Sequence, residues 1–290
     1  MSWALAIIAV VPYTIPNLTA CLDEPSFFSC ENTTVVRNAC CSPSPGGLVL
    51  QTQFWDTWTG LEHKGQLLPR GSWGIHGLWP DNCDGSFEQY CDFSRQFDPQ
   101  PSPAILPNGT VIPPWNGTTI DTFIKDFGRF DLLEYMNKFW INQGAPNTDF
   151  WAHEFSKHAT CTSTFDVSCF EPGYKKHEDV INFFDAVIRA FKMFPTYDIL
   201  ASAGIVPSNK TAYSLSQIQN ALKVQAGAVP FLGCAGNGTI LNEVWWFNHI
   251  LGTEQYGFFK HIDSVTPSTC SSTKPIRYFE RSPGSEREVH

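Results

Sequence analysis

The central strand of the fold is predicted at Leu48-Val49-Leu50-Gln51-Thr52-Gln53-Phe54, whose alternating and β-branched residues are typical of a strand. A loop rich in glycine follows it and leads to a second segment, Ile75-His76-Gly77-Leu78-Trp79-Pro80-Asp81-Asn82-Cys83. We therefore expect His76 to lie on or beside a strand next to the central one. A sheet would hold its imidazole in a fixed place.

Further elements follow from hydrophobic spacing. The longest predicted helix is Glu178–Phe194, which ends before Pro195 and carries an aromatic stripe that we expect in the core. The other predicted elements are helices at Asp131–Phe139, Trp151–Cys161 and Ser214–Ala226, strands at Ile240–Phe247 and Tyr256–Ile262, and a proline-rich surface loop at Pro101–Pro114.

A second histidine-bearing segment is Trp151-Ala152-His153-Glu154-Phe155-Ser156-Lys157-His158-Ala159-Thr160-Cys161. On a helix, the five-residue offset between His153 and His158 separates them by about 140 degrees, so the two rings do not readily share one metal ion. Glu154 and His158 lie one turn apart, and Lys157 flanks the same edge. One helix face thus offers a base, a carboxylate and a cation, which suits metal-free phosphoryl transfer. Trp151 is equally compatible with core packing.

Both segments resemble the active-site segments of the ribonuclease T2 family, whose patterns read H-G-L-W-P and H-E-x-x-K-H-G-T-C. The first pattern is matched at every position, and the second at all but Ala159, where the family usually has glycine. If the helix ended there in a left-handed turn, alanine would cost about 1 kcal/mol or more and tilt His158. The resemblance implies an α+β fold, in which helices pack on a central antiparallel sheet stapled by disulfides.

The resemblance also implies a chemistry. The family cleaves single-stranded RNA by attack of the 2'-hydroxyl on phosphorus, through a 2',3'-cyclic phosphate to a 3'-phosphate, and leaves DNA intact. By resemblance, His158 is the general base and His76 the general acid, Glu154 and Lys157 stabilise the pentacoordinate phosphorus, and His153 holds phosphate. The residues alone do not decide which histidine is the base. No cofactor and no metal are expected.

Base recognition is expected on aromatic side chains. By resemblance, Trp79 stacks on the base upstream of the cut, and Asp81 accepts a hydrogen bond from an exocyclic amine. Phe87 stands where some fungal relatives have tyrosine, so it keeps stacking and lacks the hydroxyl. Phe150 is the candidate for the second base site, with Asn142 and Gln143 as further candidates. Low base specificity follows.

Ten cysteines and six glycosylation sequons indicate an oxidising compartment. Cysteine positions alone do not define the pairing. The resemblance implies five bridges: Cys21 with Cys41, Cys30 with Cys83, Cys40 with Cys169, Cys91 with Cys161, and Cys234 with Cys270. The sequons begin at Asn17, Asn32, Asn108, Asn116, Asn209 and Asn237, and we expect glycans on the last five.

The domain organisation is predicted from composition. The apolar run near the start indicates a signal peptide at residues 1–20, followed by one catalytic domain at 21–270 and a charged, mobile tail at 271–290. No stretch approaches the roughly 20 apolar residues of a membrane span. We therefore expect a protein that does not enter a membrane, is monomeric, and is secreted or held in a vacuolar or lysosomal lumen.

Net charge limits the nucleic-acid hypothesis. The chain carries −9 at neutral pH, which opposes general binding of nucleic acid. Protonation of all eight histidines would bring −9 to −1, so acidic pH is the expected working range. One alternative is a secreted binding or cytotoxic protein on the same fold, with catalysis secondary. Another is a zinc hydrolase, which the histidine spacing argues against.

Overall fold

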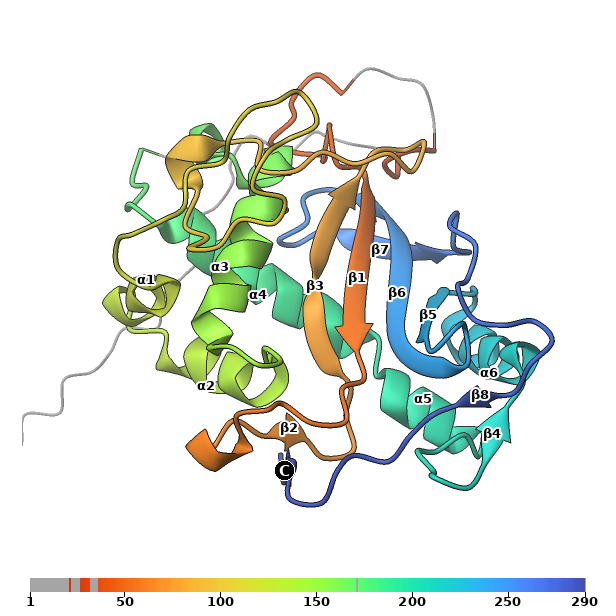
Figure 1. Cartoon of the computed structure of the whole chain (residues 1–290). Coiled ribbons are helices and arrows are strands. Elements are labelled where there is room, and N and C mark those ends of the chain that lie inside the picture. The colour runs from red at the N-terminus through yellow and green to blue at the C-terminus, as the bar shows by residue number, and fades with distance from the viewer. Residues whose placement is uncertain (1–20, 22–26, 32–35, 171, 290) are drawn as a thin grey trace, which may run out of the picture.

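The computed structural model describes residues 21, 27–31, 36–170 and 172–289. The predicted signal peptide and Asn32 lie outside the described residues. The main sheet has the path β3-β1-β6-β8-β4, and β5 and β7 also pair with β6 (Figure 1). Its strands are β1 (Leu48–Phe54), β3 (Gly74–Asp81), β4 (Ala212–Tyr213), β5 (Phe231–Ala235), β6 (Ile240–Leu251), β7 (Phe258–Ile262) and β8 (Ile276–Arg277).

The centre of the sheet is antiparallel, because β1 pairs in that sense with both β3 and β6. Only the short contact between β6 and β8 is parallel among the pairs of this sheet that the structure describes. Strand β1 has the predicted bounds and is buried on both faces. Its polar Gln53 is buried, and the Nε2 of this side chain donates to the Phe194 carbonyl at 2.8 Å. The predicted α+β class is confirmed.

Helices cover the sheet and its two ends. Helix α4 (Glu178–Met193) packs its aromatic stripe into the core as predicted, and Trp151 is also a core residue. Helices α1 to α3 gather beside β3, whereas α5 and α6 lie toward β4 and β8 (Figure 1). Their bounds are α1 (Ile120–Asp126), α2 (Phe130–Phe139), α3 (Asn147–Lys157), α5 (Thr196–Ser202) and α6 (Leu215–Ala226).

Short elements complete the chain. Five 3-10 helices are described: η2 (Glu62–Lys64), η3 (Phe93–Arg95), η4 (Ala159–Cys161), η5 (Ser163–Phe165) and η6 (Val167–Cys169). Strand β2 (Leu68–Pro69) pairs in parallel with β9 (Glu286–Arg287). Because Ala159 starts a 3-10 turn and is not in the left-handed region, alanine causes no backbone strain there.

The prediction of a mobile tail at 271–290 is wrong for the residues that the structure describes there. Tyr278 is fully buried, and its hydroxyl accepts a hydrogen bond from Trp73 Nε1 at 2.9 Å. The Arg281 guanidinium lies 4.1 Å from the centre of the Trp55 ring and donates to the carbonyls of Pro69 and Ser72. Low aliphatic content misled the prediction, because a few large side chains suffice to anchor a segment in existing pockets.

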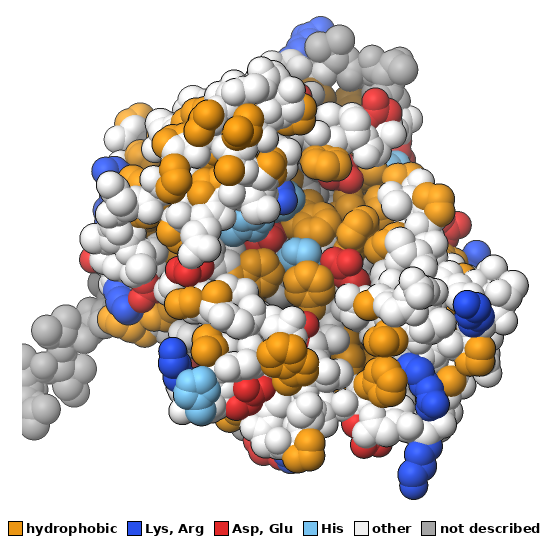
Figure 2. Space-filling model, in the orientation of Figure 1, with side chains coloured by type: hydrophobic (Ala, Val, Ile, Leu, Met, Phe, Trp, Pro, Cys, Tyr) orange, Lys and Arg blue, Asp and Glu red, His pale blue; other side chains and the backbone are white. Residues whose placement is uncertain are grey.

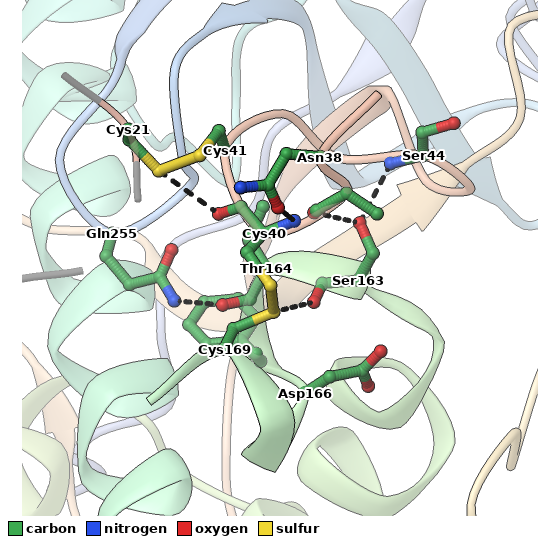
Figure 3. The surroundings of a disulfide bond; sticks show 12 residues. Cys21, Asn38, Cys40, Cys41, Ser44, Ser163, Thr164, Asp166, Cys169 and Gln255 are labelled. Carbon is green, nitrogen blue, oxygen red and sulfur yellow. Dashed lines mark hydrogen bonds between the residues drawn. A yellow bond between two sulfur atoms is a disulfide. The ribbon is translucent and has the colours of Figure 1, made fainter. Parts of the chain in front are cut away.

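Five disulfides join the pairs that the resemblance implies. The bridge between Cys40 and Cys169 ties an early loop to η6, beside the bridge of Cys21 and Cys41 (Figure 3). The bridge between Cys91 and Cys161 joins the loop after β3 to the end of the α3 segment. Two stretches that are far apart in sequence are thereby held together.

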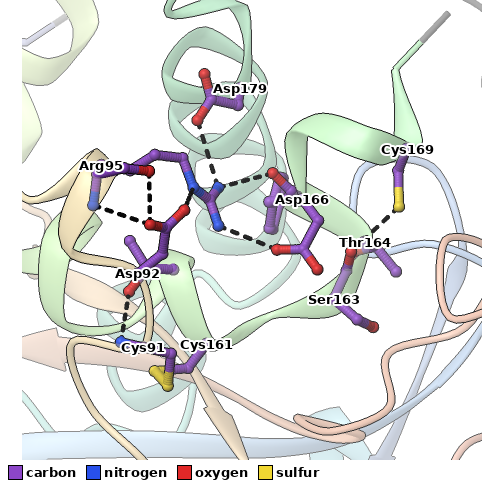
Figure 4. Close-up of polar contacts among 12 residues, drawn as sticks. Cys91, Asp92, Arg95, Cys161, Ser163, Thr164, Asp166, Cys169 and Asp179 are labelled. Atoms are coloured by element: carbon purple, nitrogen blue, oxygen red, sulfur yellow. Dashed lines mark hydrogen bonds and ion pairs between the residues drawn. A yellow bond between two sulfur atoms is a disulfide. The ribbon is translucent and has the colours of Figure 1, made fainter.

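A buried arginine strengthens the same junction. Arg95 pairs with Asp92 at 2.7 Å, Asp166 at 3.0 Å and Asp179 at 3.4 Å, next to the bridge of Cys91 and Cys161 (Figure 4). Its guanidinium has three carboxylates to offset the cost of burial. The loop after β3 is therefore held by ionic as well as covalent contacts.

Stability should fall as the pH rises, because of Glu254. This side chain is 1% exposed, its Oε1 has no hydrogen-bond partner among the described residues, and burial raises its pKa from 4.5 to about 8. Between these values the folded protein keeps a proton that the unfolded chain has released, so folding is favoured less at each step up in pH. Thermal unfolding followed from pH 4.5 to 8 should show a falling midpoint and a smaller fall in Glu254→Gln. The exposed substitution Glu134→Gln is the control; an equal slope in Glu254→Gln would contradict the assignment.

Candidate active site

The two histidine segments meet around one buried carboxylate. Glu154 of α3 is 1% exposed, and its Oε1 lies 3.5 Å from His76 Nε2 on β3. Its Oε2 lies 3.9 Å from Nε2 of His158, the residue that follows the last residue of α3. Figure 2 shows histidines and carboxylates gathered in the hollowed centre of one face, with hydrophobic side chains around them. Two imidazoles thus flank one carboxylate.

Gly77 explains how the carboxylate comes so close to the sheet. A Cβ at this position would lie 1.9 Å from Glu154 Oε2 and 2.9 Å from Trp79 Nε1, so no other residue fits without displacing Glu154. Trp79 Nε1 donates to the same Oε2 at 2.8 Å. The glycine and the tryptophan of the first segment therefore position the glutamate of the second.

His76 has a carboxylate at each ring nitrogen. Besides Glu154 near Nε2, Glu243 Oε1 lies 3.1 Å from Nδ1, and the ring stacks on Phe54 at 3.8 Å between centroids. When the ring carries both protons, each N–H faces an acceptor. Sequence reasoning missed Glu243; the available signal was an acidic residue inside the apolar strand predicted at Ile240–Phe247.

His158, unlike His76, has an environment that disfavours positive charge on its ring. The side chain is buried, and its ring stacks on Trp79 with centroids 5.0 Å apart and planes 16° apart. Burial lowers the pKa of His158 well below its ordinary value, and the positive charge of Lys157 acts in the same direction. Burial therefore favours the neutral form of His158, which has a ring nitrogen lone pair that can accept a proton.

His153 is oriented by two residues that the sequence did not indicate. Its Nδ1 lies 2.8 Å from Asp98 Oδ2, and the Tyr90 hydroxyl donates to that same oxygen at 2.8 Å. Asp98 is 2% exposed. Both partners lie in irregular chain between β3 and α1, where no pattern in the sequence marked them. The contact leaves Nε2 as the ring nitrogen available to a ligand.

The predicted base-binding residues fall into two places. Asp81 and Phe87 pair across an isolated bridge at the end of β3, where Phe87 is 61% exposed. Burial raises the pKa of Asp81 from 3.8 to about 7. Phe150 lies on the other side, 5.5 Å from the His76 ring. Trp79 lies between these places, with one part of its ring already against His158.

Three residues that the sequence proposed for the site make contacts other than the expected ones. Lys157 forms no ion pair with Glu154 in the part of the chain that the structure describes. Asn142 Nδ2 donates to the Pro146 carbonyl, and Gln143 Nε2 donates to the Trp58 carbonyl, so both amide donors serve loop structure. Phe150 thus remains the better supported second base site.

An acid–base enzyme is the class that this fold and site define, because two imidazoles in unlike environments share one carboxylate at a hollowed surface. The chain belongs to the ribonuclease T2 family, whose family model matches residues 46–277. Its enzyme class is therefore endoribonuclease.

Similar proteins include fungal ribonucleases. The chain is 38% identical over 255 residues to ribonuclease T2 of Aspergillus oryzae, covering 88% of this chain and 82% of that one. It is 41% identical over 247 residues to ribonuclease Trv of Hypocrea rufa, covering 85% and 92%. Among solved structures, Actibind, a T2 ribonuclease, superposes with a TM-score of 0.74 at 33% identity, covering 89% of this chain and 96% of that chain.

The close approach at Gly77 predicts a specific loss of activity. Gly77→Ala should displace the Glu154 carboxylate and lower turnover on RNA by about 10²-fold, since small misplacements of catalytic groups have costs of that order. Gly74→Ala on the same strand is the matched control, because its Cβ would meet only ordinary contacts at 3.5 and 3.7 Å. Rates are compared alongside circular dichroism; a folded Gly77→Ala protein with normal turnover would show that the contact does not matter.

Proposed function

We propose that the protein cleaves single-stranded RNA by transesterification in acid, without a metal ion and with low base specificity. The observation that carries the proposal is the pair of imidazoles on opposite sides of Glu154, one with carboxylates at both nitrogens and one buried. Digestion of homopolymer RNA at about pH 5 in chelator, with products identified as cyclic or 3'-phosphates, tests it.

The two histidines take different roles in this proposal. His158, whose neutral form is favoured by burial, removes the proton of the 2'-hydroxyl, and that oxygen attacks phosphorus. His76, whose two N–H bonds are aimed at Glu154 and Glu243 when protonated, donates a proton to the departing 5'-oxygen. The P–O5' bond breaks as the P–O2' bond forms. Hydrolysis of the cyclic phosphate then gives the 3'-phosphate.

Charge on the phosphate is met by neighbouring groups. His153, held through Nδ1 by Asp98, presents Nε2 to a phosphate oxygen. Lys157, which is not paired with Glu154, supplies positive charge to the pentacoordinate centre. Glu154 stays close to both imidazoles and stabilises whichever of them is protonated as the reaction proceeds.

Base recognition combines stacking with one titratable group. Trp79 and Phe87 stack on the upstream base, and Phe150 stacks on the downstream base. Since the pKa of Asp81 is about 7, its carboxyl is protonated at the working pH and offers both a donor and an acceptor. A group that can donate or accept suits several bases, which supports low specificity. DNA lacks the attacking hydroxyl and is not a substrate.

The compartment is proposed to be extracellular or a vacuolar or lysosomal lumen. Five disulfides support it, as do the exposed positions of the four described sequon asparagines: Asn108, Asn116, Asn209 and Asn237. Across the described ranges, no helix combines the length and apolar character needed to cross a bilayer. We propose a monomer that acts away from membranes.

The alternative, a secreted binding or cytotoxic protein with catalysis secondary, is not favoured. Actibind belongs to the T2 ribonucleases described as antitumorigenic agents, and that description concerns Actibind alone. In this chain His76 and His158 are both present, and each lies within 4 Å of the Glu154 carboxylate, at 3.5 and 3.9 Å. A fold kept only for binding would not require that arrangement.

Removing either histidine should abolish most of the activity. His76→Ala and His158→Ala should each lower turnover by about 10² to 10⁴, the usual contribution of proton transfer. The exposed His63→Ala serves as the control, since it lies in η2 outside the site. Single-turnover cleavage of a homopolymer measures the effect. Near-normal rates in either site variant would overturn the assignment.

The protonation of the Asp81 carboxyl should make the base preference of the enzyme change with pH. Below about pH 7 its carboxyl is neutral and can donate, whereas above that value it is a carboxylate that only accepts. The ranking of the four homopolymer rates should therefore differ between about pH 5 and pH 8 in the wild type, and stay constant in Asp81→Asn. Asp126→Asn, an exposed carboxylate elsewhere, should behave as the wild type. A ranking that shifts equally in Asp81→Asn would assign the effect to another group.

A further inference from the structure

A cavity of about 670 Å³ lies at the amino end of α3, outside the contacts already described. Its walls come from η2 and the loop after it, from α1 and α2, from the first turn of α3 and from β9. Strand β2, the partner of β9, lies below α2 in Figure 1. Segments distant in sequence thus converge on one space.

Positive charge predominates in this cavity. Lys64, Lys125 and Arg287 line it, together with one carboxylate, Asp121, which pairs with Lys125 at 2.5 Å. Neither Lys64 nor Arg287 forms an ion pair with any of the residues described in the structure. A chain of net charge −9 therefore holds two uncompensated cations in one cavity.

Arg287 has hydrogen-bonding capacity to spare. Its Nη2 donates to the Asn137 carbonyl, while Nε is buried without a hydrogen-bond partner among the described groups. The neighbouring acids do not neutralise it, because Glu286 pairs with Arg70 and Arg281, and Glu288 pairs with Arg70. Side chains alternate between the two faces of a strand, so Glu286 and Glu288 point away from the face on which Arg287 lies. A guanidinium that has no carboxylate partner and still has free N–H groups is a good donor to a phosphate oxygen.

Helix α3 connects the cavity with the active site. Along α3, His158 and Glu154 are followed toward the amino end by Phe150 and then by Asn147 and Thr148, which line the cavity. Asn147 lies seven positions before Glu154 on the helix, which corresponds to a rise of roughly 10 Å. A strand whose downstream base lies at Phe150 would bring one of its next phosphates to this point.

The opposite end of the site differs in charge. A second cavity, of about 660 Å³, lies beyond Phe87 and is lined by Glu88, Asp92 and Phe93 among others, with neither lysine nor arginine among the described residues of its lining. Backbone phosphate has no cation to bind there. The cavity at the amino end of α3 and the cavity beyond Phe87 therefore differ in their ability to bind a polyanion.

We infer that the cavity at the amino end of α3 is a phosphate subsite for the RNA backbone on the 3' side of the cleaved bond, with Lys64 and Arg287 as its cations. The inference rests on the proposed function, which sets the direction of the strand. Added nucleotides on the 3' side then increase kcat/KM, whereas nucleotides on the 5' side have little effect.

Substrates with a single ribose test this directly. A dinucleotide is compared with versions extended by two deoxynucleotides on the 3' or on the 5' side, so that only one bond can be cut. In the wild type, the 3' extension should raise kcat/KM about tenfold, the scale of one or two phosphate contacts. Lys64→Gln and Arg287→Gln should each remove about threefold or more of that gain and leave dinucleotide cleavage unchanged.

The controls separate binding from structure. Lys223→Gln removes an exposed lysine of α6 outside the cavity and should keep the full gain. The Lys64 side chain makes no hydrogen bond or ion pair within the described ranges that its loss would break, so it tests the subsite even if Arg287→Gln destabilises the protein. The salt dependence of log kcat/KM on the 3'-extended substrate should become shallower by about 0.7 for each lost contact.

Two outcomes overturn the inference. One is a wild type that cleaves the dinucleotide but gains nothing from the 3' extension; the other is a gain that both variants retain in full. Either result leaves the proposed function in place. If the wild type fails to cut the dinucleotide and the extended substrates at their single ribose, the proposed function itself fails and the subsite with it.

Discussion

The contact between the Glu154 carboxylate and the backbone of Gly77 is the constraint on which the site depends. Helix α3 lies so close to β3 that only a glycine fits at position 77. The indole N–H of Trp79 donates a hydrogen bond to the buried Glu154 oxygen. The close packing fixes the position of the Glu154 carboxylate. Because both imidazoles are placed relative to that carboxylate, the distances that proton transfer needs follow from one packing event.

The surrounding structure keeps that contact from opening. The bridge between Cys91 and Cys161 and the buried Arg95 with its three aspartates hold the loop after β3 against the end of α3. Asp98, just beyond that loop, orients His153. Removing Arg95 would leave the buried Asp179 carboxylate without the cation it pairs with among the described residues, which costs more than the loss of an exposed pair. The scaffold and the site are therefore stabilised by the same residues.

Acid favours the folded state of this protein, as well as the chemistry that we propose for it. Burial raises the pKa of Asp56 to about 6, of Asp81 to about 7 and of Glu254 to about 8, so each is neutral in acid and destabilises the fold when it ionises as the pH rises. Acid also reduces the negative charge that would repel RNA. Burial lowers the pKa of His158 and so favours its neutral form, which can accept a proton.

Local features of the sequence determined β1 at Leu48–Phe54, the end of α4 before Pro195 and the presence of both histidine segments, because spacing and helix-breaking residues act over a few positions. The resemblance added the roles and the pairing of the cysteines. Only the tertiary structure decided that Glu243, 167 residues from His76, would complete its environment, and that the last segment would pack on Trp73. The burial of a side chain and the charges around it depend on which distant segments pack together, and a local sequence pattern contains no information on that packing.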